Sequence, residues 1–267
     1  MIAGSALGAL LLLLAVLFVG GARGGAAPGA AVRAGGSAAS SVPWFVDHRT
    51  DEAVAEAQAK IDKGDFATAI DTLTGIEKKG PDRADVHMLL ERAYTGTRSG
   101  REAMREAGLW LAADASAAAA DLKLQEDVRN AALVKDSQDE AFMLLESKMG
   151  TRGVDILYDI AYGNSGRLYP QAATRAKHSL SQDDVRGRAS PALSVLLDFG
   201  DAKGCEAKHE LLDRARQQGD ARMLTLLQKY QPTRGCGFLG VTDCYPCLHR
   251  DQALRDAMSA IEERAVK

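Results

Sequence analysis

Residues 56–82, EAQAKIDKGDFATAIDTLTGIEKKGPD, decide the fold because a second segment repeats their pattern. Residues 91–116, ERAYTGTRSGREAMREAGLWLAADAS, align with them at a constant offset of 34 residues. The corresponding positions include Ala59 and Ala93, Ala69 and Ala103, and Ile76 and Trp110. Small residues such as these alanines are expected where two helices cross closely. The stretch GDFATAI indicates the turn into a second helix, so each segment predicts a helical hairpin.

The period and the residue types resemble the tetratricopeptide repeat (TPR), a helix–turn–helix module. The resemblance covers about residues 51–115, and its second copy is degenerate because Gly100 stands where Phe66 predicts an aromatic residue. It implies that the repeat-packing residues are Ala59, Ala69, Ala93 and Ala103. Two such repeats cannot bury their hydrophobic face alone, so we expect further helices behind them.

Apolar residues with the 3.6-residue helical period indicate these further helices. Ser190-Pro191 is typical of a helix start, Gly219 of a helix stop and Asp220 of an N-cap. Positions expected to face the core include Leu122, Val128, Ala131, Leu254, Ala257, Met258, Ile261 and Ala265. No stretch alternates with period 2. We therefore predict an all-α protein, with TPR-like hairpins over residues 44–120 and HEAT-like helix pairs over residues 121–267 that together form an α-solenoid.

The N-terminal residues 1–22 are predicted to enter a membrane. The segment from Ile2 to Ala22 has no charged residue, and its 21 residues match a hydrocarbon core of ~30 Å when helical. It is either one transmembrane anchor or a signal segment, since small residues at its end suit a signal peptidase but no basic residue precedes it. Residues 23–43, rich in Gly, Ala and Ser, predict a flexible linker. The lipid bilayer is therefore an expected partner of residues 2–22.

Composition and motifs exclude several classes of function. The net charge of −3, without a basic stripe, argues against nucleic acid as a partner. The tripeptides Asp198-Phe199-Gly200 and His249-Arg250-Asp251 occur in protein kinases, but here their order is reversed and the nucleotide-binding elements are missing. We treat them as coincidental and expect Phe199 in the core and His249 at the surface. His87 is expected to be a packing residue rather than a ligand. We predict no enzyme activity, no catalytic residue and no cofactor.

The most unusual segment is the cysteine-rich stretch near the C-terminus. Cys205, Cys236, Cys244 and Cys247 have the spacing C-x30-C-x7-C-x2-C. An even number of cysteines in an exported chain favours two structural disulfides, for which three pairings are possible. A disulfide from Cys205 would close a loop of at least thirty residues and contribute roughly 3–4 kcal/mol. The intervening glycines, Gly235, Gly237 and Gly240, would allow tight backbone turns.

Two other interpretations of the cysteines stay open. A structural zinc ion would use Cys244 and Cys247 as one half-site and Cys205 with His209 as another, but the lone Cys236 leaves the pattern incomplete. Alternatively, the thiols stay reduced, or Cys244 and Cys247 form the redox pair of a thiol–disulfide oxidoreductase. No βαβ pattern surrounds that pair, which weakens this interpretation.

Three stretches resemble one family. GVDILYDIAY (153–162), RASPALSVLLDFGDAKGCEAKHELLDRARQQGDARML (188–224) and RGCGFLGVTDCYPCL (234–248) are similar to the C-terminal region of membrane-bound serine/threonine kinases from myxobacteria and relatives. The resemblance implies a single pass through the inner membrane, a helical-repeat domain on the extracytoplasmic (periplasmic) side and oxidised cysteines. Arg23 and Arg33 favour the opposite orientation, but the resemblance outweighs two arginines. The chain departs from the family because it lacks the kinase domain.

These observations predict a membrane-tethered, non-enzymatic helical-repeat module of the cell envelope that binds a protein or peptide ligand or acts as a sensor. The first alternative is the sensory half of a serine/threonine kinase receptor whose kinase domain is missing from this chain. The second is the oxidoreductase that uses Cys244 and Cys247.

Overall fold

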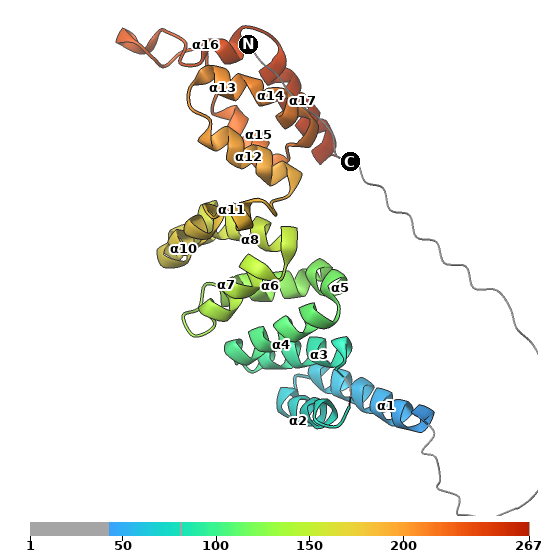
Figure 1. The fold of residues 1–267 in the computed structure, drawn as a ribbon. Coiled ribbons are helices and arrows are strands. Elements are labelled where there is room, and N and C mark those ends of the chain that lie inside the picture. The colour runs from blue at the N-terminus through green and yellow to red at the C-terminus, as the bar shows by residue number, and fades with distance from the viewer. Residues whose placement is uncertain (1–42, 81, 267) are drawn as a thin grey trace, which may run out of the picture. The chain divides into compact units, whose positions relative to one another are not determined.

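The computed structural model describes residues 43–80 and 82–266, and Figure 1 shows their arrangement. This part of the chain is all-helical, and its one β-type pairing is an isolated bridge between Cys236 and Thr242. The all-α prediction is therefore confirmed. The predicted membrane segment, residues 2–22, lies outside the described residues, as does the predicted linker apart from Pro43. Within the described ranges, no helix combines the length and the apolar character that crossing a membrane requires.

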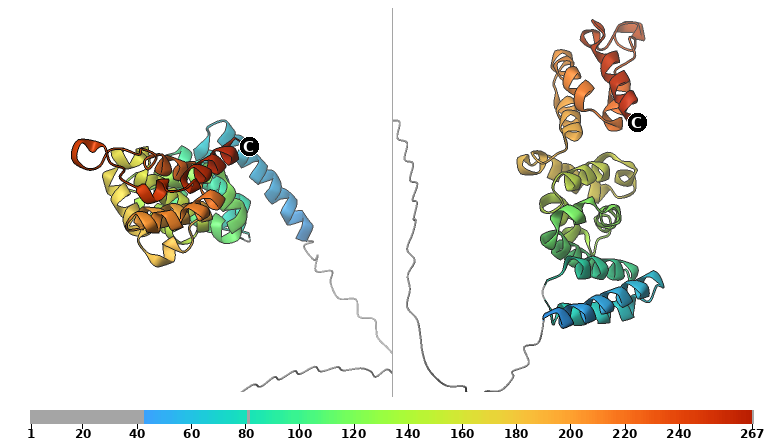
Figure 2. Two further views of the ribbon diagram at one scale, coloured as in Figure 1. Left: turned by 90° about the horizontal axis from the view of Figure 1, so that it is seen from above. Right: turned by 90° about the vertical axis from the view of Figure 1, so that its right-hand side faces the viewer.

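The first helices form two hairpins whose turns are equivalent at the predicted offset. The hairpins and the short helix after them comprise α1 (Pro43–Asp62), α2 (Phe66–Glu77), α3 (Ala84–Gly96), α4 (Gly100–Ala113) and α5 (Ala115–Ala120). The starts of α2 and α4 keep the offset of the sequence repeat, as do the ends of α1 and α3. Figure 2 shows that successive helices lie side by side in chain order.

Both turns use a residue in the left-handed backbone region. Gly64 has φ +79°, and Arg98, its equivalent in the second hairpin, has φ +62°. The next residue closes the turn in both cases, because the N–H groups of Asp65 and Ser99 each donate a hydrogen bond of 2.9 Å to a carbonyl of the preceding helix. Glycine adopts this conformation without steric cost. Arginine adopts it only at a cost in energy, so the second turn is locally strained.

Three of the four predicted packing alanines lie in the core and one does not. Ala69, Ala93 and Ala103 are buried, whereas Ala59 is exposed and Ala57 is buried in its place. Two residues along a helix correspond to about 200° of rotation, so Ala57 and Ala59 lie on opposite faces of α1. The alignment placed the hairpins correctly, but Ala59 is not a packing residue.

The middle of the chain continues with shorter helices. They are α6 (Leu122–Ala131), α7 (Gln138–Ser147), α8 (Gly150–Tyr162), α9 (Asn164–Leu168), α10 (Pro170–Leu180) and α11 (Asp183–Arg186). Val128 and Ala131 face the core as predicted, but Leu122 is exposed because it begins α6, where its side chain lies beyond the packed turns. The 34-residue offset is lost here. The start of α7, at Gln138, lies more than 34 residues after the start of α4, at Gly100.

The C-terminal helices have the predicted caps. They are α12 (Pro191–Asp201), α13 (Cys205–Glu210), α14 (Leu212–Gln218), α15 (Ala221–Gln228), α16 (Pro246–His249) and α17 (Ala253–Ala265). Ser190 caps α12 through Leu193 N, Asp220 caps α15 and Gly219 ends α14. The predicted stripe of α17 is buried except for Ala265, which is exposed in the last turn.

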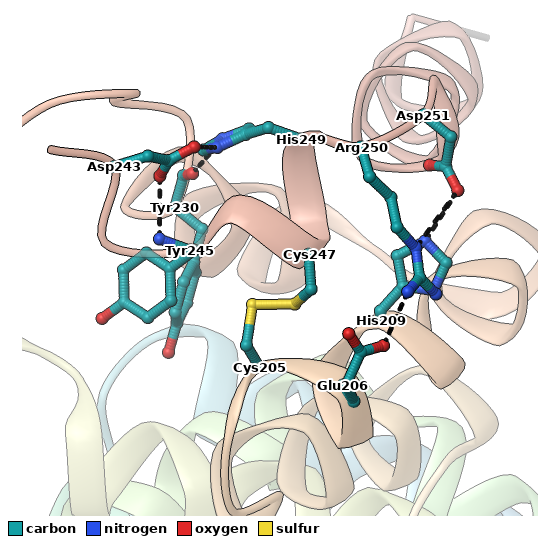
Figure 3. The surroundings of a disulfide bond; sticks show 10 residues. All are labelled: Cys205, Glu206, His209, Tyr230, Asp243, Tyr245, Cys247, His249, Arg250 and Asp251. Carbon is teal, nitrogen blue, oxygen red and sulfur yellow. Dashed lines mark hydrogen bonds and ion pairs between the residues drawn. A yellow bond between two sulfur atoms is a disulfide. The ribbon is translucent and has the colours of Figure 1, made fainter.

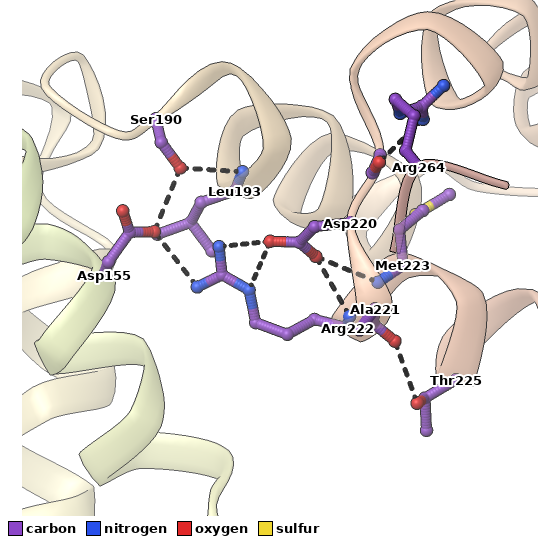
Figure 4. A network of polar contacts seen from close by, with 10 residues as sticks. Asp155, Ser190, Leu193, Asp220, Ala221, Arg222, Met223, Thr225 and Arg264 are labelled. Atoms are coloured by element: carbon purple, nitrogen blue, oxygen red, sulfur yellow. Dashed lines mark hydrogen bonds and ion pairs between the residues drawn. The ribbon is translucent and has the colours of Figure 1, made fainter. Parts of the chain in front are cut away.

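An ion-pair network ties these C-terminal helices to α8 (Figure 4). Arg222 of α15 donates to Asp155 of α8 at 3.0 Å and to its own N-cap, Asp220, at 2.6 Å. Ser190 Oγ donates to the same oxygen of Asp155 at 3.0 Å. Asp155 of α8 thus binds both the N-cap of α12 and an arginine in the first turn of α15, and these helices share one hydrophobic cluster that runs from Ala103 to Ile261.

Candidate functional site: the disulfide-closed loop

The four cysteines form two disulfides, so the disulfide prediction is confirmed and the pairing is resolved. Cys205 bonds to Cys247, with Cα atoms 5.9 Å apart, and Cys236 bonds to Cys244, with Cα atoms 5.1 Å apart. No cysteine is left as a free thiol. Cys244 and Cys247 therefore have different partners, although they are close neighbours in the sequence. Neither a redox disulfide between these two nor a zinc site built from Cys205, His209, Cys244 and Cys247 matches this pairing.

The Cys205–Cys247 disulfide joins the start of α13 to α16 (Figure 3). It closes a loop of 42 residues, which corresponds to about 4 kcal/mol in the chain-entropy treatment. Two polar contacts lie beside it: Arg250 donates to Glu206 at 2.9 Å, and His209 Nε2 lies 2.8 Å from Asp251. His209, the other candidate zinc ligand, is thus bonded to a carboxylate.

The kinase-like tripeptides have structural roles in this region. Phe199 is buried in the core, as predicted. Its neighbour Asp198 accepts from two arginines, Arg186 at 2.9 Å and Arg214 at 2.7 Å. His249 is half-buried rather than at the surface as predicted, because its ring bridges the Asp243 carboxylate at 2.6 Å and the Tyr230 carbonyl at 2.9 Å.

The second disulfide closes a compact loop, residues 236–244, that projects from the helices (Figure 1). Cys236 and Thr242 exchange two backbone hydrogen bonds of 3.0 Å, and Gly235 N donates to Gly240 O at 3.0 Å. Glycine is required at Gly237, whose φ is +73° and where a Cβ atom would lie 2.4 Å from Thr242 Oγ1. The loop is therefore fixed by covalent, hydrogen-bonded and steric constraints together.

The tip of this loop presents apolar side chains to solvent. Phe238, Leu239 and Val241 are 90%, 80% and 64% exposed. Leu239 also has φ +72°, a conformation that costs a non-glycine residue roughly 1–2 kcal/mol. Leu239 has a strained backbone and contributes nothing to the core. A role in binding another molecule therefore explains it better than a role in stability. We name these three residues the apolar tip.

The base of the loop is anchored by Asp243. Its carboxylate accepts from the backbone N–H of Tyr245 at 2.8 Å and from His249 Nδ1 at 2.6 Å. The hydrogen bond from Tyr245 is the larger cause of a lowered Asp243 pKa, and the one from His249 adds to it. The ring of Tyr245 packs against Tyr230 with centroids 4.6 Å apart, which connects the loop base to the core.

No protein-family model, characterised protein or solved structure matches the chain. The candidate site therefore rests on its own geometry. Sequence reasoning found the cysteines and the glycines of this loop but missed the apolar tip. A signal was present, because GFLGV places large apolar residues between glycines inside a predicted disulfide loop. Apolar residues bounded by glycines have too few neighbours to build a core.

Proposed function

We propose that the chain is a membrane-tethered, non-enzymatic α-solenoid of TPR-like and HEAT-like helix pairs that binds a protein partner in the cell envelope. The observation that carries this proposal is the apolar tip, held rigid by the Cys236–Cys244 disulfide at one end of the helices. A preorganised loop loses little conformational entropy on binding, so its exposed side chains contribute more of their burial to affinity.

The two disulfides support the proposed location on the extracytoplasmic side of the inner membrane, since disulfides persist in oxidising compartments. The equivalent turns at Gly64 and Arg98 support the TPR-like organisation of the first hairpins. Kinase-receptor ancestry stays a proposal that rests on sequence resemblance alone, and an in-frame kinase domain upstream in the transcript would support it.

A protein partner fits the tip better than a membrane surface does. Loops that dock on anionic bilayers combine apolar residues with several lysines or arginines, each worth about 1 kcal/mol near the surface. Here Arg234 and Asp243 flank the tip, so its local charge is zero. A cluster of apolar side chains with a charged and polar margin is typical of the centre of a protein interface.

Photo-crosslinking from the tip tests the proposal. In this experiment a photo-reactive phenylalanine analogue replaces Phe238 in the full chain. The protein is then irradiated in membranes of the organism that produces it. We expect a discrete crosslink to one protein. Adding Leu239→Ser removes a neighbouring anchor, which typically costs about 2 kcal/mol or roughly thirtyfold in affinity, so the crosslink should be lost.

The matched control is Leu168→Ser, which alters another exposed leucine, 77% accessible on the short helix α9. The crosslink should persist in this variant. A crosslink that survives Leu239→Ser, or one that forms only to lipid, would overturn the proposed protein-docking role of the tip.

A further inference from the structure

A buried histidine between carboxylates lies away from the disulfide loop, where α2, α3 and α4 meet. His87, on the first turn of α3, is 1% exposed. Its Nδ1 lies 2.8 Å from Glu106 Oε2 of α4, and its Nε2 lies 2.5 Å from Asp82 Oδ1 in the connection before α3. The expectation of a purely packing residue does not account for these two polar partners.

A cavity of about 230 Å³ opens beside the ring, and Glu77, Asp82, Val86 and His87 are among the residues that line it. Glu77, the last residue of α2, brings a third carboxylate to this place. One ligand atom from each of Glu77, His87 and Glu106 lies within 4.8 Å of the other two. A single ion can therefore contact all three side chains after small side-chain adjustments, since metal–ligand bonds to N and O are about 2.0–2.2 Å long.

The charges at this place are not balanced by the protein. Glu106 is only 7% exposed, and His87 is its sole hydrogen-bonding partner among the described residues. Arg83, which also lines the cavity, already donates to Asp85 and Asp51, and Arg105 of α4 acts on Glu106 through its charge without a hydrogen bond. Three carboxylates thus face one imidazole, and an added cation would neutralise the excess.

We propose that Glu77, His87 and Glu106 bind a divalent transition-metal ion, with zinc preferred, and that Asp82 is a positioning residue. Imidazole nitrogen and carboxylate oxygen are both zinc ligands, and three of them leave the fourth tetrahedral position open to water from the cavity. Asp82 would hold the proton on Nε2 and so leave Nδ1 free to bind the metal, as carboxylates commonly do behind metal-bound histidines. The metal would replace a proton between His87 and Glu106.

The test is a zinc titration in which the full chain competes with a chromophoric chelator for the metal. The disulfides of the chain are kept intact and any free thiol is alkylated beforehand. We expect one zinc ion per chain. Glu77→Gln should weaken binding at least tenfold, because it removes the charge of a direct ligand. Glu77 is half-buried and has no hydrogen-bonding partner among the described residues, so this variant should fold normally. Asp82→Asn should weaken binding as well, and X-ray absorption of the bound zinc should show nitrogen and oxygen ligands without sulfur.

Two controls separate this site from other histidines and carboxylates. Glu56→Gln alters an exposed glutamate of α1, and His178→Asn alters a histidine of α10 outside the cluster; both should bind zinc like the parent chain. Absence of stoichiometric zinc, unchanged affinity in Glu77→Gln, or a sulfur-ligated ion would each overturn the proposal. His87 would then be a protonated side chain held by two carboxylates. The apolar tip is remote from this readout, so the outcome is independent of the proposed function.

Discussion

Glu91 is a buried acid whose ionisation should oppose folding, and Glu91→Gln should remove that cost. Its side chain is fully buried on α3. One carboxylate oxygen accepts from Thr95 Oγ1 at 3.2 Å, while the other, Oε2, has no partner. Burial, reinforced by the nearby charge of Asp127 on α6, raises the pKa of Glu91 from 4.5 to about 8. The folded chain therefore keeps a proton that the unfolded chain loses above pH 4.5.

The sign and the size of the effect follow from proton linkage. Between pH 4.5 and about 8 the folded state binds more protons at Glu91 than the unfolded state does, so stability falls as pH rises through this interval. Each pH unit costs about 1.4 kcal/mol, which amounts to about 3 kcal/mol at pH 7 and about 5 kcal/mol above pH 8. Below pH 4.5 the residue is protonated in both states, and the cost disappears.

Urea unfolding followed by circular dichroism at several pH values from 4.5 to 8.5 gives the free energy of unfolding and so tests this prediction. Glutamine keeps the shape and a hydrogen bond to Thr95 but cannot ionise, so Glu91→Gln should match the parent near pH 4.5 and exceed its stability by up to about 3 kcal/mol at pH 7. The exposed Glu56→Gln serves as the matched control and should leave the pH dependence unchanged. If the difference between Glu91→Gln and the parent does not grow with pH, the reasoning about Glu91 is wrong.

Three further predictions concern the disulfides, the loop and the helix glycines. In urea unfolding, Cys247→Ser should lower the free energy of unfolding by about 4 kcal/mol, because it opens a disulfide across 42 residues. Cys244→Ser should lower it by about 2–3 kcal/mol, because its disulfide spans only 8 residues. Equal losses would contradict the loop-entropy account. Leu239→Gly relieves a positive φ, so thermal unfolding should show stability equal to the parent or up to about 1 kcal/mol higher, while crosslinking from the tip declines; a marked loss of stability would show that the side chain is structural. Two glycine-to-alanine variants should have opposite effects in urea unfolding. Gly75→Ala should stabilise the protein by about 0.5–1 kcal/mol, because the new Cβ has open space around α2. Gly153→Ala should destabilise it by roughly 2 kcal/mol or more, because its Cβ would lie 2.2 Å from Leu145 O.

Local signals along the sequence predicted the helices well. The caps at Ser190 and Asp220 and the stop at Gly219 depend on contacts within a few residues, so they can be read from short stretches. Ala59 is exposed, against the prediction, because burial depends on the rotation of α1 relative to its neighbours, which an alignment of two imperfect repeats does not determine. The same limit applies at Leu122, which has the right spacing but stands at the first position of its helix.

The candidate sites were less predictable because their parts come from distant segments. Four cysteines allow three pairings, and only the packing of α13 against α16 brings Cys205 to Cys247. His87 has no metal-binding spacing in the sequence, since Glu77 and Glu106 belong to different helices. Sequence reasoning finds residue types that can carry chemistry, but the tertiary structure decides which of them meet.

Buried ionisable residues lie at the boundary between the first three helices and the rest of the chain. One hydrophobic cluster covers α1–α3 and a second begins at Ala103, with Met88 and Tyr94 packed against both. Between the clusters lie buried ionisable groups, namely His87, Glu91, Glu106 and Asp127. Apolar burial stabilises a boundary at every pH, whereas buried acids stabilise it only when protonated or neutralised by a cation. The attachment of α1–α3 should therefore weaken as Glu91 ionises with rising pH, and it should respond to zinc through His87.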